Sequence, residues 1–595
     1  MKKMLLLIFS ATCLASCSLK ETISNVFSPS STNNYDTDPV TTITTDISST
    51  SYDEKEVVDE NVAPENIIEE NATSITQSGN YYFTGEINPI TIKKNLEVFL
   101  FFDGVTMTTQ SSRAIDGKDG TKVHIIMQNG STNSIVSDCG KNALSLNGDL
   151  YLSGNGTLNI ESKQKKAIKA DGDIFVSGEN FTLNVNSIEH AISGRSLVVN
   201  KSSIVVSSKD DGFHLNCDDT VTAFTNEQGY GHFVDAKITA DTYGDGIQAA
   251  SYVYISGGEI NLTTHGEFVS YSSANITTYD LETDDFKYVK SGSTYKRVAK
   301  DEIRTLNSNY YALTQSVKGI KVGAIEDSSG KDITTGDYEI SIAHLAKVTV
   351  SSFDDCIHTN YGKVTLDSCN LELDTLDDGV HADYNLDINN ASIHVSSSYE
   401  GLEGANVTIS GAETNIVSYS NDDGINAASG LVSQTNITIN DGFLRIYASG
   451  DGVDANDGLY FKGGTTIVEG PGSGNGSLDA EKIYFQGGIV FACSTNGMTE
   501  QMTATQNTFV YQGSTMATNK VISITDSNSS VLFSYTLKQS CNQLIFSHAD
   551  LQIGSSYNIM ADSTKITTIS ITSLLTKVGV SGGGPGGGGG PGGFH

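Results

Sequence analysis

The sequence predicts an all-β protein whose main domain is a parallel β-helix, a coil of short stacked strands. Three observations predict it. Gly is frequent (59 of 595 residues) while Pro is rare (7), which is typical of short strands joined by tight turns. A motif of two acids, a Gly and a short apolar run recurs along the chain. Its copies keep one spacing: Asp355 and Asp378 are 23 residues apart, and Asp378 and Asp423 are 45 apart, or two periods.

A fixed period of this length indicates a solenoid, in which each turn of the coil buries its apolar face only by stacking on its neighbours. A β-sandwich would need hairpins and irregular strand lengths instead. The copies of the motif read KDDGFHL near Asp211, YGDGIQA near Asp245, FDDCIHT near Asp355, LDDGVHA near Asp378, YEGLEGA near Glu400, NDDGINA near Asp423 and SGDGVDA near Asp451.

The N-terminus reads as an export signal. Lys2 and Lys3 precede an apolar run, Met4 to Ala11, that is too short to span a membrane. The following LASC resembles a bacterial lipoprotein signal, which predicts removal of residues 1–16 and lipidation of Cys17. An ordinary cleaved signal is the alternative. We therefore expect an exported lipoprotein, anchored to a membrane at the bacterial cell envelope or surface.

The rest of the chain divides by composition. Residues 17–71 are rich in Ser, Thr, Asp and Glu without apolar periodicity, which predicts a disordered tether. We expect the coil over residues 72–487, with a repeat-poor insertion at about 268–314. Longer alternating stretches over residues 488–580 predict a C-terminal β segment that caps the coil. Residues 581–595 are a Gly-rich tail that cannot bury a core.

The repeated acids predict a metal site. Successive turns of a β-coil rise by about 4.8 Å, so acids at one register would repel unless a cation lies among them. Calcium takes six to eight oxygen ligands in flexible geometry and suits such a set. The alternative is that these acids only cap turns. The expected calcium ligands are Asp210, Asp211, Asp245, Asp354, Asp355, Asp377, Asp378, Glu400, Asp422, Asp423, Asp451 and Asp454.

The formal charge of −34 excludes nucleic acid as a natural partner. It also repels acidic substrates unless cations intervene. Tryptophan is absent, so a flat Trp platform for neutral sugars is excluded. Six cysteines lie beyond the signal without the spacing of a zinc site; we expect small buried residues, and a monomer.

The motifs DDGVHA, DDGINA and GDGVDA, the SGNGTLNI segment and the stretch from Ser78 to Ile115 together resemble a known family. It is the family of bacterial secreted carbohydrate-binding β-helix proteins of the clostridial polygalacturonate-binding type. The resemblance covers about Ile75 to the Gly-rich tail. It implies a right-handed parallel β-helix, calcium at the Asp-containing turns, and binding of acidic, uronate-containing plant polysaccharide such as pectin.

A non-catalytic binding protein is the first hypothesis, because calcium can bridge an anionic protein to an anionic polymer. A pectate-lyase-like enzyme is the second. It needs a basic residue beside the calcium, and Lys169 or Lys321 shares its register with His358 and His381. The alternative is that these lysines only neutralise nearby acids. His214, His358 and His381 either bind the metal or stack on one another between turns as polar residues. A structural adhesin or surface spacer is the third hypothesis.

Overall fold

The computed structural model describes residues 42–48, 64–218, 220–266, 316–323, 325–471, 475–495 and 501–580, and between residues 268 and 313 the strands alone. The signal, Cys17, most of the predicted tether and the Gly-rich tail lie outside the described residues. No helix in the described part of the chain has the length and apolarity needed to cross a membrane.

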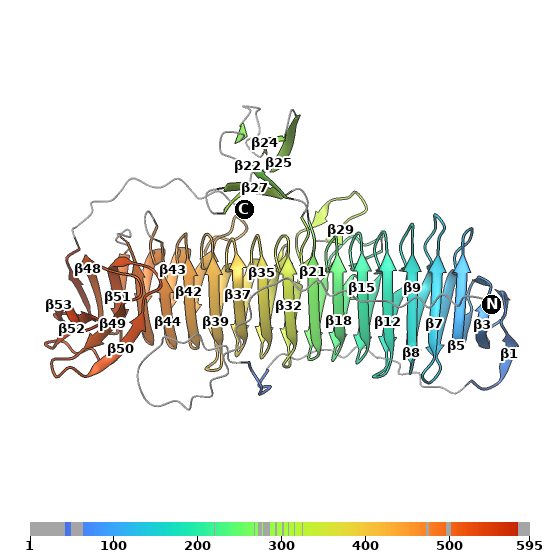
Figure 1. Ribbon diagram of the computed structural model, residues 1–595, viewed down its shortest axis with the longest axis horizontal. Helices are drawn as coiled ribbons and strands as arrows, with labels where there is room; N and C mark the ends of the chain where they lie inside the picture. Colours follow the sequence, from blue (N-terminus) through green and yellow to red (C-terminus); the bar gives the residue numbers. More distant parts are fainter. Residues whose placement is uncertain are drawn as a thin grey trace, which may run out of the picture.

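The described chain forms an elongated all-β coil of about 15 turns with extra antiparallel sheets at its C-terminal end (Figure 1). Each turn contributes strands to three faces, and each strand pairs in parallel with its equivalent in the next turn. The predicted parallel β-helix is therefore confirmed. The coil begins with β1 (Ile67–Glu70), β2 (Ser74–Ile75), β3 (Gly79–Ile87), β4 (Ile90–Ile92) and β5 (Glu97–Thr109).

The first face carries short strands of three residues, and some longer strands run on from the first face into the second. The short strands are β10 (Ile168–Ala170), β13 (Ile192–Gly194), β16 (Phe213–Leu215), β19 (Ile247–Ala249), β28 (Ile320–Val322), β33 (Ile357–Thr359) and β40 (Ile425–Ala427). The longer strands are β6 (Ile115–Met127), β8 (Leu144–Gly154), β36 (Val380–Asn389), β38 (Leu402–Ser410), β43 (Val453–Phe461) and β45 (Leu478–Phe485).

The second and third faces complete each turn. The second face holds β11 (Asp173–Ser177), β14 (Ser196–Asn200), β17 (Tyr230–Val234), β20 (Tyr252–Ser256), β31 (Tyr338–Ala343), β34 (Gly362–Asp367) and β41 (Asn436–Ile439). The third face holds β7 (Thr132–Ser137), β9 (Thr157–Ser162), β12 (Thr182–Ser187), β15 (Ser203–Ser208), β18 (Lys237–Thr242), β21 (Glu259–Thr264), β32 (Lys347–Ser352), β35 (Asn370–Thr375), β37 (Ser392–Ser398), β39 (Asn415–Ser420), β42 (Phe443–Ala448), β44 (Thr465–Glu469) and β46 (Ile489–Ser494).

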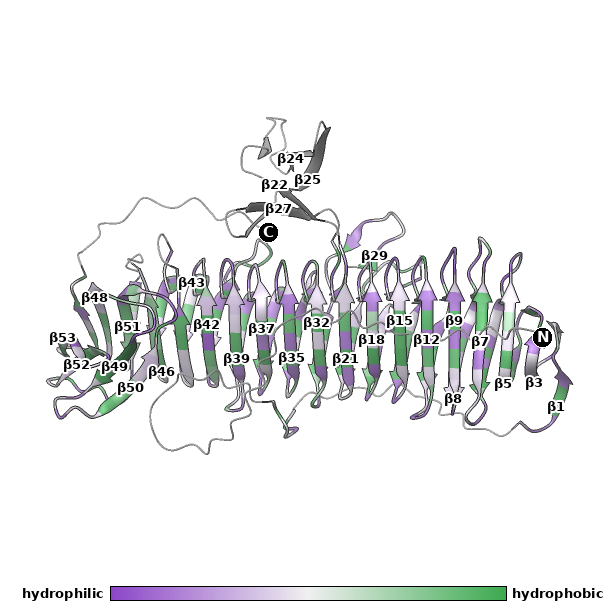
Figure 2. Cartoon of the chain, in the orientation of Figure 1, coloured by the Kyte–Doolittle hydropathy of each residue, from purple (hydrophilic) through white to green (hydrophobic). Residues whose placement is uncertain are grey.

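Alternation along each strand builds the core. In β12, Leu183 and Val185 are buried while Asn184 faces outward, and the next turn repeats the pattern with Ile204 and Val206. Figure 2 shows hydrophobic and hydrophilic stretches along the stacked strands. The inward Ile, Val and Leu side chains form one continuous apolar column along the coil.

The predicted insertion leaves the coil between β21 and β28. It contains two antiparallel three-stranded sheets rather than a plain loop: β22 (Phe268–Tyr271), β27 (Asn309–Leu313) and β26 (Ile303–Leu306), and β23 (Ile276–Thr277), β24 (Phe286–Ser291) and β25 (Thr294–Ala299). A short hairpin of β29 (Ile325–Glu326) and β30 (Asp332–Ile333) follows β28.

The C-terminal β segment that the sequence predicts is present, and its strands pair mainly antiparallel. The parallel pairing continues past residue 487, because β46 pairs with β44 and β47 (Gln501–Ala504) pairs with β45. Then β51 (Cys541–Ser547) pairs antiparallel with β46 and β48 (Thr508–Met516), and β54 (Leu575–Val578) lies beside β48. A four-stranded sheet of β50 (Val531–Thr536), β49 (Val521–Thr525), β52 (Ser556–Ala561) and β53 (Thr564–Ser570) completes the end.

Part of the predicted tether contacts the coil. The backbone N–H of Ile43 donates to the side-chain oxygen of Asn370 (2.7 Å), and the Asn370 amide donates back to the carbonyl of Ile43 (3.2 Å). The carboxylate of Asp46 lies 3.0 Å from Nδ1 of His344. Residues 42–48 therefore lie against the middle of the coil, at the turns that lead into its third face.

Candidate functional site

The acidic motifs lie together along one edge of the coil, in the turns that lead from the third face to the first. Backbone hydrogen bonds fix their register. The N–H of Gly379 donates to the carbonyl of Glu400 (3.0 Å), and the N–H of Gly401 donates to the carbonyl of Asp423 (3.0 Å). The residues at this register form what we call the turn column: Lys166, His190, Asp211, Asp245, Lys318, Asp355, Asp378, Glu400, Asp423 and Asp451.

One oxygen of most acids in the turn column has a structural partner. Oδ1 of Asp211 accepts from the backbone N–H of Asp245 (2.8 Å), and Oδ1 of Asp423 accepts from that of Asp451 (2.6 Å). Asp355 accepts in the same way from the next turn (3.0 Å). An acid at this register thus ties adjacent turns together without any ion, which explains its recurrence. The second carboxylate oxygen faces other side chains of the site; in Asp211 and Asp378, for example, it lies beside a histidine.

A second row runs beside the turn column, at the second residue of each first-face strand from β10 to β45. This strand column contains Lys169, Ser193, His214, Gln248, Lys321, His358, His381, Glu403, Asn426, Asp454 and Asp479. Asp454, an expected ligand, therefore belongs to a different row from Asp423 and Asp451. The remaining expected acids, Asp210, Asp354, Asp377 and Asp422, each precede a member of the turn column.

A lysine stands within the acidic run. Lys318 is buried in the turn column, and its Nζ lies 3.1 Å from Oδ2 of Asp354 and 2.5 Å from Oδ2 of Asp355. Although burial favours the neutral carboxylic acid, Lys318 holds the pKa of Asp355 well below its usual value. Asp354, Asp355 and Asp377 lie close enough together to share an ion. In this structure the Lys318 ammonium supplies that positive charge.

The histidines change the chemistry of two sections. Nδ1 of His214 lies 2.6 Å from Oδ2 of Asp211, and the half-buried His190 also contacts this carboxylate, 3.3 Å away. Burial, together with the nearby His214, lowers the pKa of His190. These three side chains form a compact cluster that has the composition of a metal site.

The cluster around His381 has a different charge state. Asp378, His381 and Glu403 come together, with Nδ1 of His381 2.8 Å from Glu403 and 3.1 Å from Asp378. Although burial disfavours the charged imidazolium, Glu403 and Asp378 raise the pKa of His381 well above its usual value. A protonated His381 thus neutralises this section. His358 pairs with Asp355 (2.6 Å) and stacks on His381, with ring centroids 4.7 Å apart.

Only oxygen and amide groups occupy the C-terminal section of the two columns. Burial, reinforced by Asp422, Asp454 and Asp451, raises the pKa of Asp423 to about 9. Burial also raises the pKa of Asp451 to about 6. Within the described residues, no Lys, Arg or His lies within ion-pair distance of Asp422, Asp423 or Asp451. These acids must therefore bind protons or an added cation.

A glycine makes room for these carboxylates. A Cβ at Gly450 would lie 2.3 Å from Oδ1 of Asp422 and 2.4 Å from Oδ1 of Asp423, which is too close for any side chain. In the preceding turn, Oε2 of Glu400 accepts a hydrogen bond from the amide of Asn426 (2.9 Å). Among the described residues, the groups of three or more side chains that are already close enough to share an ion lie in the other sections of the columns, so an ion here would have to draw these carboxylates together. This section fits a hard cation such as calcium, which prefers oxygen ligands.

The two candidate basic residues both have acidic neighbours. Nζ of Lys169 lies 2.7 Å from Asp171, and Nζ of Lys321 lies 3.7 Å from Asp245. Both belong to the strand column, in register with the histidines as expected. Their contacts match the alternative hypothesis that they neutralise nearby acids.

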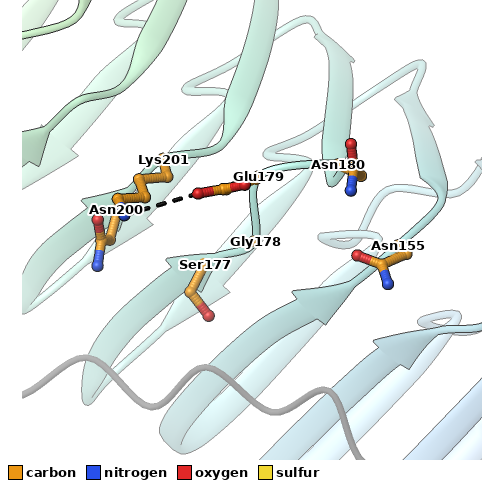
Figure 3. A pocket seen from close by; sticks show the side chains of 7 residues that line it. All are labelled: Asn155, Ser177, Gly178, Glu179, Asn180, Asn200 and Lys201. Carbon is orange, nitrogen blue, oxygen red and sulfur yellow. Dashed lines mark ion pairs between the residues drawn. The ribbon is translucent and has the colours of Figure 1, made fainter.

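A shallow pocket of about 280 Å³ lies at another edge, in the turns from the second face to the third (Figure 3). Amide groups dominate its lining, and Lys201 pairs with Glu179 across it (3.6 Å). Its lining residues are Asn155, Ser177, Gly178, Glu179, Asn180, Asn200 and Lys201. It contains no aromatic platform and lies apart from the turn column.

Three site residues did not follow from the sequence: Lys318, His190 and Glu403. An alignment of the turns nevertheless places each of them at a position of the site. VKGIKV aligns with YGDGIQA and puts Lys318 at an Asp position, and EHAISG puts His190 there. In EGLEGA, Glu403 stands at the position of His381. The turn of Lys318 lacks the acid, and the turn of His190 lacks both the acid and the Gly, so a motif search misses these two turns.

Known proteins resemble the chain as follows. No curated protein matches it. A solved structure described as a polysaccharide lyase-like protein from C. thermocellum, gadolinium derivative, shares 21% identity over 32% of this chain and 81% of that chain, with a TM-score of 0.28. A likeness at this score supports no conclusion on activity or ligand. A family model described as carbohydrate-binding domain-containing protein matches residues 69–361 and 305–476. These ranges span most of the coil, and the chain therefore belongs to the carbohydrate-binding domain-containing protein family.

Proposed function

We propose that this protein is a non-catalytic binder of acidic, uronate-containing polysaccharide such as polygalacturonate or pectin, and that calcium in the C-terminal section of the turn column bridges protein and polymer. The observation that supports it most is the group Asp422, Asp423 and Asp451, which has no protein cation among the described residues. Burial and the negative charges of Asp422, Asp454 and Asp451 raise the pKa of Asp423 to about 9, and a bound cation would offset both effects.

The donor chemistry selects this section for calcium. At Asp354 and Asp355 the Lys318 ammonium already supplies the charge. Around Asp211 and Asp378 the neighbours include imidazole nitrogens, which calcium rarely accepts. We therefore narrow the expected calcium set to Glu400, Asp422, Asp423, Asp451 and Asp454. Here the residues would hold the ion, and the ion would supply the positive charge that a uronate carboxylate requires.

The ligand class follows from charge. A protein with a formal charge of −34 attracts an anionic polymer only where cations concentrate at its surface. Cation sites on a straight edge suit a linear polymer that contacts several turns at once, so weak contacts add up through their effective concentration. Neutral glucans carry no carboxylate for the ion, and their binding would not depend on calcium.

The test compares binding of the purified protein to immobilised polygalacturonate and to a neutral glucan, in calcium and in chelator, while ultraviolet absorbance reports unsaturated product. A triple Asp422→Asn, Asp423→Asn, Asp451→Asn variant should lose calcium-dependent retention. The matched control Glu413→Gln with Asp550→Asn removes exposed negative charges elsewhere and should bind like wild type.

Each outcome is decisive. Calcium-dependent retention of polygalacturonate without absorbance supports the proposal. Rising absorbance makes the protein a lyase, and Lys321→Ala should then abolish the product. If the triple variant still retains polygalacturonate in calcium, the binding site lies elsewhere. Retention of neither polymer favours the structural adhesin or surface spacer.

We also propose that Cys17 carries a lipid and holds the protein at the bacterial cell envelope or surface. The support is the LASC signal alone. Cys17→Ala should shift the protein from the detergent-soluble membrane fraction to the aqueous fraction. Membrane retention of that variant contradicts the proposed anchor.

A further inference from the structure

The opposite end of the turn column has donors of another kind. His190 and His214 come from adjacent turns and stack with ring centroids 4.1 Å apart at an angle of 7°. The Asp211 carboxylate lies against both rings, and Nδ1 of His190 is also 3.2 Å from Oδ2 of Asp210. Two imidazoles and the Asp211 carboxylate thus lie close enough together to share an ion, and the Asp210 carboxylate lies beside His190.

An unsatisfied atom points into this cluster. Nδ1 of His190 is buried and has no hydrogen-bond partner. Its neighbours at 3.2 and 3.3 Å are the carboxylate oxygens of Asp210 and Asp211. A buried ring nitrogen without a partner is costly, and a metal ion removes that cost by taking its lone pair.

The spacing of the donors matches a small tetrahedral ion. Zinc binds imidazole nitrogen and carboxylate oxygen at about 2.0–2.2 Å, so tetrahedral ligands lie about 3.3 Å from one another. The separations from His190 to Asp210 and Asp211, 3.2 and 3.3 Å, agree with this value, whereas Nδ1 of His214 and Asp211 are at a hydrogen-bond distance of 2.6 Å and would move apart around an ion. Calcium needs longer bonds and more oxygens than this cluster provides.

The surroundings hold the rings in place. The amide Nδ2 of Asn216 donates to Nε2 of His214 (2.8 Å), which orients the ring and leaves the protonated Nδ1 facing Asp211. A metal-binding histidine donates from its second nitrogen, so an ion at Nδ1 replaces this proton and requires the Asn216 amide to turn its oxygen toward Nε2. The Asp210 side chain is 44% exposed and those of His190 and Asp211 much less, so an ion can enter from the outer edge.

We propose that His190, Asp210, Asp211 and His214 form a site for a borderline transition-metal ion, zinc in particular, that is separate from the calcium section. The histidine register elsewhere in the strand column does not provide an equivalent site. His358 makes the same 2.6 Å contact with its own acid, but the Lys318 ammonium occupies the position next to it. His358 is therefore the matched control.

The test uses the full chain after chelator washing, with Co²⁺ as a spectroscopic probe and Zn²⁺ as its competitor. A visible absorption band of tetrahedral cobalt should appear with one ion per site and should disappear on addition of Zn²⁺, but not of excess Ca²⁺. His190→Gln and His214→Gln should each weaken the apparent affinity at least about tenfold, while His358→Gln should leave it unchanged. Thermal midpoints in chelator confirm that each variant is folded.

Three results overturn the proposal: no cobalt band, equal displacement by Ca²⁺, or a band that survives His190→Gln and His214→Gln. A band that disappears only in His381→Gln assigns the ion to the other histidine cluster and also overturns it. The triple Asp422→Asn, Asp423→Asn, Asp451→Asn variant should retain the band, so this site and the polysaccharide site fail or succeed independently.

Discussion

Lys318 forms ion pairs with both Asp354 and Asp355. Replacing Lys318 by Met removes this positive charge. All three side chains are buried: the exposed fractions are 8% for Lys318, 4% for Asp354 and 2% for Asp355. Met keeps much of the volume of Lys but none of its charge. Two buried carboxylates then lie together without the ammonium, and His358 remains as the partner of Asp355.

The cost follows from these contacts. Removing one partner of a buried ion pair typically costs about 3–5 kcal/mol, because the remaining charge is left desolvated. The two lost charge-assisted hydrogen bonds, at about 1.5–3 kcal/mol each, give a similar sum. Calcium should restore part of it, since the vacated position becomes a third cation site. An ion at 100 times its Kd contributes about 2.7 kcal/mol.

Chemical denaturation in chelator and in calcium measures both effects, with hydrogen exchange of residues 316–323 and 347–359 as the local readout. The matched control is Lys321→Met, whose side chain is 26% exposed and 3.7 Å from Asp245; it should cost less than about 1 kcal/mol. Our reasoning is refuted if Lys318→Met is as stable as wild type in chelator, or if calcium stabilises both proteins equally.

Three further predictions concern other parts of the molecule. In chelator, Asp423, whose pKa is raised to about 9 by burial and by Asp422, holds a proton that the unfolded chain releases; the free energy of unfolding should therefore fall as pH rises from about 4 to about 9, and melting curves that show no such fall in wild type relative to Asp423→Asn would contradict it. Tyr535→Phe removes the hydroxyl that donates to the buried Glu469 and should destabilise the C-terminal sheet by about 1–3 kcal/mol, seen as faster hydrogen exchange in β49 and β52; unchanged exchange would count against it. Asn370→Ala removes both hydrogen bonds to Ile43 and should make residues 42–48 sensitive to limited proteolysis, whereas equal cleavage of both proteins would show that the segment is held otherwise.

The sequence predicts the coil well because its physics is periodic. One spacing fixes the register, and alternation within each turn fixes which side chains face inward, as in Leu183 and Val185. The acids of the turn column follow from the same period. What the period does not contain is the partner of each acid, since the neighbour across a turn comes from a residue about 23 to 73 positions away.

Lys318 shows the limit most clearly. The insertion separates β21 from β28 and interrupts the regular spacing of the turns, so this spacing does not identify VKGIKV as a turn. His190 is hidden for another reason, because its turn has Ala191 where other turns have Gly. The sequence therefore predicts one uniform set of calcium ligands. In the structure this set divides into sections of different charge and donor chemistry, because each turn places a different side chain beside its acid.

The fixed register of the turn column also sets the distance between any two of its members. Asp211 and Asp423 are separated by six steps along the column, through Asp245, Lys318, Asp355, Asp378 and Glu400. At about 4.8 Å per step this is about 29 Å. A luminescent lanthanide in the C-terminal section and a cobalt ion beside His190 would thus lie at a separation that is set by residue register alone, within the useful range of energy transfer. Inserting or deleting one whole turn between them should change that separation by one step, so optical measurements could count the turns of a solenoid in solution.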